Sequence, residues 1–418
     1  MKFLILFLVI TFLSPNIISP FRIEDMVLLF LALQFIAVHI IKKKPIILSI
    51  MPLNVFLLLF ISFFLSLLSG SILSSGEITI RDFAYIFQTI KYFLVYSISY
   101  YLYDKSKCSI EVVFIAITWI GLVSGMIALA QYFNFFDVNS WLTNIYIDNE
   151  FYLSQLQNES FLRRTVGTSF NSNHFGFLIG LPILSGLILC INYKKYMYYG
   201  IVAVLVGSLI TTLSRTSVLI VAFYIILLFF SMVVRKRRKS LLLPICFFFV
   251  FLGGAVFTWQ LKNMDENSPL YKRVEPTTQL VLTQENSITK RLDMWANSID
   301  YIISHTGAII FGLGPQKATM STVTDNEYIS TLRKSGVFGI FLIVCIELFI
   351  VISSLKYLVF DKSLDGQSLA MFVLCTTLGL MVYQLMSEVV NNPQVMSIII
   401  TYFGFFFKYR HQSTKSMI

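Results

Sequence analysis

Apolar runs long enough to cross a bilayer recur along almost the whole chain. A helix needs about 20 mainly apolar residues to span the hydrocarbon core. On this basis twelve spans are predicted: residues 3–20, 24–41, 46–69, 83–103, 109–131, 173–192, 197–213, 216–234, 241–258, 334–355, 368–389 and 394–407. The pattern predicts an all-α, polytopic integral membrane protein, with residues 1–418 forming a single transmembrane domain.

The composition excludes the main soluble classes. Hydrophobic residues make up 56% of the 418 residues and charged residues only 13%, against about 25% charged residues in a typical soluble domain. A soluble enzyme, a disordered chain and a disulfide scaffold are therefore excluded. The five cysteines fall in apolar runs or at their edges, so we expect no disulfide and no structural metal.

The distribution of charge orients the spans. The net charge is +10, and basic clusters follow every second span: Lys42–Lys44, Lys105 and Lys107, Lys194–Lys195, Arg235–Lys239, Lys356 and Lys362, and Lys408, Arg410 and Lys415. Such clusters mark the cytoplasmic side. We therefore expect both termini in the cytoplasm and the lipid bilayer, rather than nucleic acid, as the partner of the positive charge.

Three segments qualify this topology. The first apolar run follows Lys2 as in a signal peptide, but it lacks an obvious small-x-small cleavage site before Pro20, so we expect a retained helix. The two long outward loops are residues 132–172 and residues 259–333, the larger of which is predicted to be partly helical. Long ordered loops are usually functional.

Arg215 lies where the chain has little length to spare. Between Lys195 and Arg235 the chain must cross the membrane twice, so we expect two short helices and a turn at Thr212–Thr216. This turn would pull Arg215 below the outer surface. A guanidinium there either reaches outward to the headgroups or binds a phosphate or pyrophosphate group, and we favour the second interpretation.

A second polar group precedes the predicted span 173–192. The pair Arg163 and Arg164 is followed by Asn171-Ser172-Asn173-His174. The asparagines and serine are good helix N-caps, and a helix N-terminus also attracts anions. Both interpretations stay open, while His174 is expected to be a helix-end residue.

Lys91, in the span 83–103, also allows two interpretations. The side chain either reaches the outer surface or points into a polar cavity.

The large outward loop contains three further candidates. Residues 288–304 have the apolar spacing of an amphipathic surface helix, which would place Arg291 near the headgroups unless its charge is simply solvated. Gly312-Leu313-Gly314-Pro315 predicts a turn, and as a phosphate-binding loop it is a weak signal. Asp325-Asn326-Glu327-Tyr328 can cap the next helix or supply a general base for a sugar hydroxyl.

Taken in order, these motifs resemble the family of O-antigen polymerases and O-antigen ligases. The resemblance covers about residues 80–345 and is carried by Arg164…Gly167…Asn171…Asn173, Ser214-Arg215, Arg291…Trp295, Gly312-Leu313-Gly314-Pro315 and Asp325-Asn326-Glu327-Tyr328. Each motif is weak alone, whereas their order with one large late outward loop is moderately specific.

The resemblance implies a metal-independent glycosyltransferase without a cofactor, in the bacterial inner membrane with its site on the periplasmic face. Its substrate would be an oligosaccharide on undecaprenyl diphosphate. Arg215 and Arg291 would hold the diphosphate, and Asp325 or Glu327, or else His305, would be the base. The other expected substrate-binding residues are Arg163, Arg164, Lys91, Asn173, Asn326, Tyr328 and Trp295.

The resemblance leaves three functions to separate. Ligases of the family carry a histidine where this chain has Asp325, which favours a polymerase that makes O-antigen or capsule and works with a chain-length regulator and a flippase. A ligase that transfers finished glycan to another acceptor is the first alternative. A flippase of lipid-linked oligosaccharide is the second, but charges within spans are few, chiefly Glu347 and Lys91.

Overall fold

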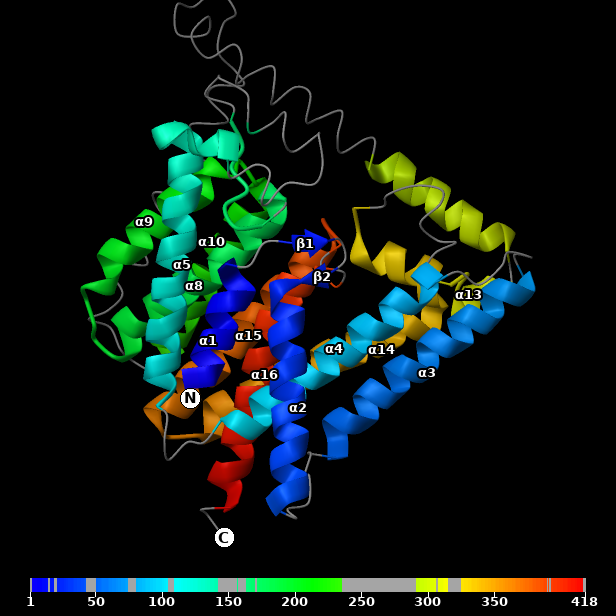
Figure 1. The fold of residues 1–418 in the computed structure, drawn as a ribbon, viewed down its shortest axis with the longest axis horizontal. Helices are drawn as coiled ribbons and strands as arrows, with labels where there is room; N and C mark the ends of the chain where they lie inside the picture. Colours follow the sequence, from blue (N-terminus) through cyan, green and yellow to red (C-terminus); the bar gives the residue numbers. More distant parts are fainter. Residues whose placement is uncertain are drawn as a thin grey trace, which may run out of the picture. The chain divides into compact units, whose positions relative to one another are not determined.

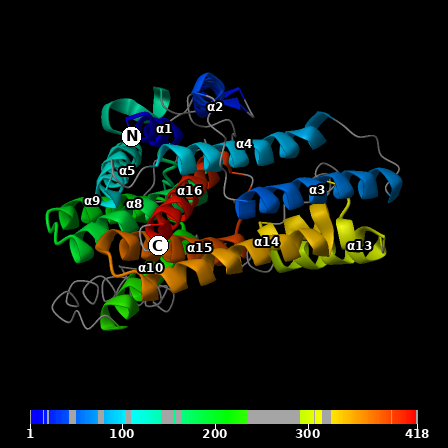
Figure 2. The ribbon, with the colours of Figure 1, turned by 90° about the horizontal axis from the view of Figure 1, so that it is seen from below.

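A computed structural model shows a helical membrane protein (Figures 1 and 2). It describes residues 2–13, 16–18, 21–42, 50–73, 80–103, 109–141, 156, 163–169, 171–234, 291–305, 307–314, 325–388, 390 and 392–415. Within these ranges, the helices long and apolar enough to cross a membrane are Asn54–Ile72, Ile110–Phe133, Ser172–Asn192, Glu327–Phe360 and Leu364–Gln384. The predicted span 241–258 and most of the loop 259–333 lie outside the described residues.

The chain divides into two compact units, each described by itself below. The first comprises Met1–Ile120 and Met294–Ile418, and the second comprises Gly121–Asp293. The boundary falls within α5, Ile110–Phe133, and within the helix formed by residues 291–304.

The first unit is a helical bundle with one small sheet. Its elements are α1 (Lys2–Leu13), β1 (Asn16–Ile18), β2 (Phe21–Arg22), α2 (Ile23–Lys42), α3 (Ile50–Leu73), α4 (Ile80–Leu102), the start of α5, α13 (Ala308–Phe311), α14 (Glu327–Phe360), α15 (Leu364–Gln384) and α16 (Pro393–Lys415). Helix α16 packs on α4 and α15, and α14 packs on α15 and α3. Gly404 allows the close approach of α16 to α4, because a Cβ there would press on the backbone of Tyr100.

The first helix is shorter than the predicted span 3–20. It ends at Leu13, and the antiparallel pair β1–β2 follows before α2 begins at Ile23. The sequence supplies a reason, since Pro15 and Pro20 lack the N–H that a helix needs and proline disfavours the helical conformation in the residue before it. The apolar run was therefore misleading about helix length here.

Helix α14 is kinked at Gly336, where φ is +66°. The kink exposes the carbonyls of Arg333 and Lys334, which accept hydrogen bonds from the backbone N–H of Leu313 (2.8 Å) and Gly314 (3.2 Å). A Cβ at Gly312 or at Gly336 would overlap the opposing backbone. The Gly-x-Gly turn therefore docks on the kink and, with these N–H groups occupied, is not a phosphate loop.

The second unit is built around a buried helix. It contains the end of α5, η1 (Phe135–Asp137), α8 (Ser172–Asn192), α9 (Tyr198–Thr211) and α10 (Arg215–Val234). Helix α8 is buried along almost its whole length and packs on α9 and α10. Helix α9 has 14 residues, about 21 Å of helix, which confirms the predicted short span, whereas α10 has 20 residues and begins at Arg215 itself.

Candidate functional site

The first turns of α8 and α10 pack directly against each other in the second unit. Asn171 caps α8 by accepting from the N–H of Asn173 (2.7 Å), which confirms the predicted cap. Ser217 Oγ in α10 donates to the carbonyl of Asn173 (3.2 Å), and a Cβ on Gly176 would press into Ser217. Two helix N-termini therefore lie side by side, and both attract negative charge.

Arg164 lies beside this pair of helix ends. Its Nε donates to the carbonyl of Thr212 (3.1 Å), just after α9, and its Nη2 donates to Asn173 Oδ1 (3.0 Å) in α8. The backbone N–H of Thr165 adds a bond to the carbonyl of Thr211 (3.1 Å). The structure thus brings together Arg164 and Asn173, two of the residues predicted to bind substrate.

Arg163 points to a different element from Arg164. Its Nη1 donates to the carbonyls of Tyr132 (3.0 Å) and Gln131 (3.4 Å) in the last turn of α5. A cation is favourable at a helix C-terminus, because it meets the negative end of the dipole. The arginine pair therefore anchors one segment to α5, to α8 and to the end of α9.

Gln131 is a residue that sequence reasoning missed. Its Oε1 accepts from the N–H of Gly167 (2.8 Å) and of Val166 (3.3 Å), while its Nε2 donates to the carbonyl of Gly167 (3.1 Å). Gly167 has φ +54°, and a Cβ there would overlap the ring of Phe175. The one available signal was an amide side chain in an apolar helix, which is costly unless it is hydrogen bonded.

Arg215 is the first residue of α10, and its side chain is exposed. The chain enters α10 through Leu213, which has φ +50°, and Ser214, whose Oγ lies 2.8 Å from Ser217 Oγ. A cation at a helix N-terminus opposes the dipole. This arrangement is unfavourable for stability alone, but it puts a cationic residue in the first turn of a helix whose N-terminus attracts anions.

Two buried serine hydroxyl groups lie at or near the start of α8. Ser169 and Ser172 are each 1% exposed. Neither Oγ has a hydrogen-bond partner among the residues that the structure describes. Ser172 opens α8, and His174 in the same turn is also buried. A buried unpaired hydroxyl is uncommon, so the start of α8 retains groups able to bind a polar ligand.

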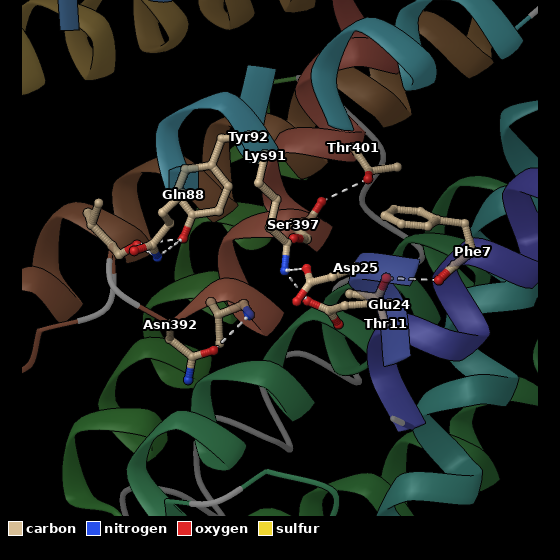
Figure 3. Close-up of polar contacts among 12 residues, drawn as sticks. Phe7, Thr11, Glu24, Asp25, Gln88, Lys91, Tyr92, Asn392, Ser397 and Thr401 are labelled. Carbon is tan, nitrogen blue, oxygen red and sulfur yellow. Dashed lines mark hydrogen bonds and ion pairs between the residues drawn. The ribbon is translucent and has the colours of Figure 1, made fainter. Parts of the chain in front are cut away.

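Lys91 in the first unit is paired with acidic residues of α2 (Figure 3). Its Nζ lies 2.7 Å from Glu24 Oε1 and 2.5 Å from Asp25 Oδ1. Glu24 is fully buried. Of the two interpretations left open by the sequence, the structure favours the inward-pointing one, with two carboxylates around the ammonium group.

Glu327 and the neighbouring helix α4 hold the segment that joins α15 to α16. Glu327 Oε2 accepts from the backbone N–H of Val390 (2.9 Å), and the carbonyl of Val390 accepts from Tyr92 Oη (2.6 Å) and Gln88 Nε2 (3.1 Å). Glu327 is only 3% exposed. Its carboxylate therefore already has a structural bond on one oxygen.

Asn326 is the N-cap of α14. Its Oδ1 accepts from the N–H of Ile329 (3.1 Å), and its Nδ2 donates to the carbonyl of Leu385 (3.0 Å). The capping interpretation is confirmed for this residue. Asp325 precedes the cap as a half-buried residue with φ +46°, a conformation that few residues other than glycine adopt and that often marks functional positions.

Comparison with known families gives a match that overlaps both units. Residues 200–344 match the sequence profile of a family described as O-antigen ligase. This matched segment covers 145 of the 418 residues. No curated protein matches the chain. The segment includes Arg215, Arg291 and Asp325, whereas Arg164 and Asn173 lie before it.

The matched residues 200–344 also contain the helix of residues 291–304. Arg291, in its first turn, and Trp295 are half-buried. On the predicted apolar face Ile302 is buried, whereas Leu292 and Ile303 are more than half exposed. His305, just after the helix, has Nδ1 within 2.9 Å of the carbonyl of Tyr301, so its ring is held locally.

Two further basic residues of this segment were missed by the sequence analysis. Arg333 is 2% exposed and Lys334 is 6% exposed, both next to the kink of α14. Lys334 Nζ lies 3.3 Å from Glu388 Oε2. Both side chains are buried beside the kink, and helical periodicity alone does not predict such a kink.

Tyr328 in the first turn of α14 donates to Glu347 Oε2 (3.3 Å). Tyr328 and Glu347 lie on opposite sides of the kink at Gly336, so the phenol of this predicted substrate-binding residue bridges the two arms of α14. As for metal sites, the described ranges contain no group of three or more His, Cys, Asp or Glu side chains placed to hold an ion.

Proposed function

We propose that the chain is a membrane glycosyltransferase that polymerises undecaprenyl-diphosphate-linked repeat units into a surface polysaccharide, either O-antigen or capsule. The observation that carries this proposal is the pairing of the α8 and α10 N-termini with Arg164 and Arg215. The O-antigen ligase family match, which begins at residue 200, supports a membrane enzyme of the polymerase and ligase type.

The chemistry needs stabilisation of a leaving diphosphate. The acceptor hydroxyl oxygen attacks the anomeric carbon, and the bond from that carbon to the phosphate oxygen breaks with its electron pair staying on the diphosphate. Guanidinium groups and helix N–H groups stabilise the charge that develops there. In our proposal Arg215 and Arg291 bind the diphosphate, Arg164 and Asn173 assist, and Arg163 holds the segment to α5.

The acceptor hydroxyl must lose its proton, and we assign this step to Asp325. Glu327 is the less suitable carboxylate, because its Oε2 accepts from Val390 and its side chain is buried. Asn326, Tyr328 and Trp295 remain proposed sugar contacts. The ammonium group of Lys91 pairs with Glu24 and Asp25, so we assign Lys91 to joining α4 to α2 rather than to binding diphosphate. No step requires a metal or a cofactor.

The finer topology belongs to the same proposal. Twelve spans with both termini in the cytoplasm would place the site on the periplasmic face of a bacterial inner membrane. The alternation of basic clusters supports this arrangement. A lipid-linked substrate delivered there by a flippase, and a chain-length regulator beside the enzyme, would be its partners.

A ligase is the second candidate, and it is supported by the match to a family described as O-antigen ligase. It would use the same diphosphate site but pass finished glycan to a different acceptor. Asp325, where the ligases that this chain resembles have histidine, favours the polymerase.

Deletion of the chain in its native host separates these functions by the glycan left behind. Loss of a polymerase leaves single-repeat products on the surface. Loss of a ligase instead leaves full-length polymer on the lipid carrier, and loss of a flippase leaves no outward-facing lipid-linked repeats. Complementation with Arg215→Ala should reproduce the deletion phenotype, whereas Arg410→Ala, at an exposed position of α16, should restore polymer. Stranded full-length polymer would replace our assignment with ligase.

A further inference from the structure

The first unit contains a long apolar cavity that the proposed reaction does not use. Its volume is about 210 Å³, and it is lined by residues of α3, α4, α14, α15 and α16. The lining residues of α16 run from Met396 to Phe407, a rise of about 16 Å at 1.5 Å per residue. Phe56, Phe349 and Phe403 contribute aromatic walls. The dimensions suit an extended hydrocarbon chain.

The cavity adjoins an open pocket at the seam between α3 and α4. That pocket, of about 160 Å³, shares Phe56 and Thr89 with the cavity and is also lined by Leu57 and Ile90, whose side chains are exposed. Only 22% of the apolar stretch of α3 is buried. In a bilayer this face of α3 contacts lipid, so a chain can enter from the hydrocarbon region.

The polar side chains in the cavity wall include Glu347 of α14 and Gln384 of α15. Glu347 is 4% exposed and Gln384 is 1% exposed, and a side-chain hydrogen bond joins them. Tyr328 donates to Glu347 Oε2. Within the described part of the chain, however, neither Glu347 Oε1 nor Gln384 Oε1 has a hydrogen-bond partner. Buried acceptors without partners are unfavourable, so this wall calls for a ligand that donates.

We propose that the cavity binds a lipid alcohol, with its aliphatic chain against the aromatic wall and its hydroxyl group between Glu347 and Gln384. A hydroxyl group donates one hydrogen bond and accepts others. When the carboxyl group is ionised, the hydroxyl group donates to Glu347. When the carboxyl group is protonated, the hydroxyl group accepts from Glu347 and donates to Gln384. A plain hydrocarbon leaves both acceptors unmet, and a phosphate head group would be repelled by the ionised carboxylate.

Isoprenoid and straight-chain alcohols share this chemistry. The proposal concerns a second lipid site and stands on the cavity and its two acceptors, so it does not depend on the diphosphate chemistry proposed above.

The test uses full-length protein in phosphatidylcholine nanodiscs and three diazirine-bearing probes. These are a geranylgeraniol analogue, a hexadecanol analogue and a hexadecane analogue without the hydroxyl group. Labelled peptides are identified by mass spectrometry, with and without excess unlabelled alcohol. We expect one or both alcohol probes to label cavity residues of α14 or α16 in a competable way, and the hexadecane probe to label them about five-fold less, as the loss of one hydrogen bond implies.

Variants separate the head-group contact from the chain contact. Gln384→Leu should reduce alcohol labelling toward that of the hydrocarbon probe, and Ile400→Trp, which fills the cavity, should reduce labelling by all probes. The matched control is Ile352→Trp, on α14 outside the cavity and half exposed, which should label as wild type. Melting temperatures check that the variants fold, and Glu347→Gln gives a second head-group variant.

Labelling by the isoprenoid alone or by the straight chain alone would identify the source of the alcohol. Equal labelling by the hydrocarbon and alcohol probes, or alcohol labelling unchanged in folded Ile400→Trp protein, would overturn the proposal.

Discussion

Arg164 donates a hydrogen bond through Nη2 to Asn173 Oδ1 over 3.0 Å, and its Nε donates to the carbonyl of Thr212 over 3.1 Å. One guanidinium thus links the end of α9 to the first turn of α8. The same turn accepts Ser217 of α10. The position of Arg164 beside two helix N-termini is therefore fixed by the fold before any substrate arrives.

Asn173→Ala should lower catalysis more than stability. Without the Oδ1 acceptor, Arg164 loses its hydrogen bond to α8, and a misplaced charge stabilises the leaving group less well. The loss of one charge-assisted bond predicts a fall in kcat of about ten-fold. The measurement is steady-state polymerisation by purified protein on a defined lipid-linked repeat unit.

Asn192→Ala, at the other end of α8, is the matched control and should leave kcat unchanged. Equal kcat for Asn173→Ala and wild type would show that this bond does not position Arg164 for the reaction.

Lys91→Met should destabilise the first unit. It leaves Glu24, fully buried, and Asp25 without the ammonium that pairs with them, and breaking a buried ion pair from one side costs about 3–5 kcal/mol. The expected result is a lower melting temperature, with activity falling only in proportion to the folded fraction. Fluorescence-detected gel filtration after heating measures the folded fraction, and polymer made from a defined lipid-linked repeat unit measures activity.

The double variant Lys91→Met with Glu24→Gln should recover part of the loss, because the uncompensated charge is removed. A Lys91→Met protein with the wild-type melting temperature and no activity would instead return Lys91 to substrate binding.

Gly336→Ala should destabilise the kink of α14. Gly336 has φ +66°, and a Cβ there would overlap the backbone of Ile310. The cost should exceed about 1 kcal/mol, since alanine at positive φ is strained as well as crowded. Gly207→Ala is the control, because Gly207 lies in α9 with nothing near its Cβ position. A melting temperature equal to wild type for Gly336→Ala would contradict the tight docking described here.

The carboxylates of Asp325, just before α14, and of Glu327, its first residue, should differ in their effect on the rate. Asp325→Asn removes the proposed base and should lower kcat by about a hundred-fold or more. Glu327→Gln keeps an oxygen that can accept from Val390, so we expect near-normal rates. Initial rates with purified variants decide between them. A reversed pattern, with Glu327→Gln inactive and Asp325→Asn active, would move the base to Glu327.

The sequence predicted well what depends on local pattern. The apolar runs predicted the helical membrane fold, the spacing of Lys195 and Arg235 predicted a short α9, and Asn171 and Asn326 were identified as caps. Each of these follows from helix length or from hydrogen bonds within a few residues. The error in α1 is also local, because the prolines after Leu13 were given less weight than hydropathy.

What the sequence could not predict is pairing between distant segments. Lys91 lies 67 positions from Glu24, and Gln131 lies 36 positions from Gly167. No periodicity connects such residues. The Gly-x-Gly turn is similar, since its glycines are explained only by the kink of α14 against which Leu313 and Gly314 donate their N–H groups. The roles of Arg215, Arg291 and Asp325 in catalysis remain predictions.

The central claim is that Arg215 holds a lipid-linked diphosphate during sugar transfer. Purified Arg215→Ala protein in proteoliposomes, given a defined undecaprenyl-diphosphate-linked repeat unit, tests it through the length of the glycan made. We predict that the repeat unit stays unextended while wild-type and Arg410→Ala proteins make polymer. Long polymer from folded Arg215→Ala protein, at the wild-type rate, would contradict the account.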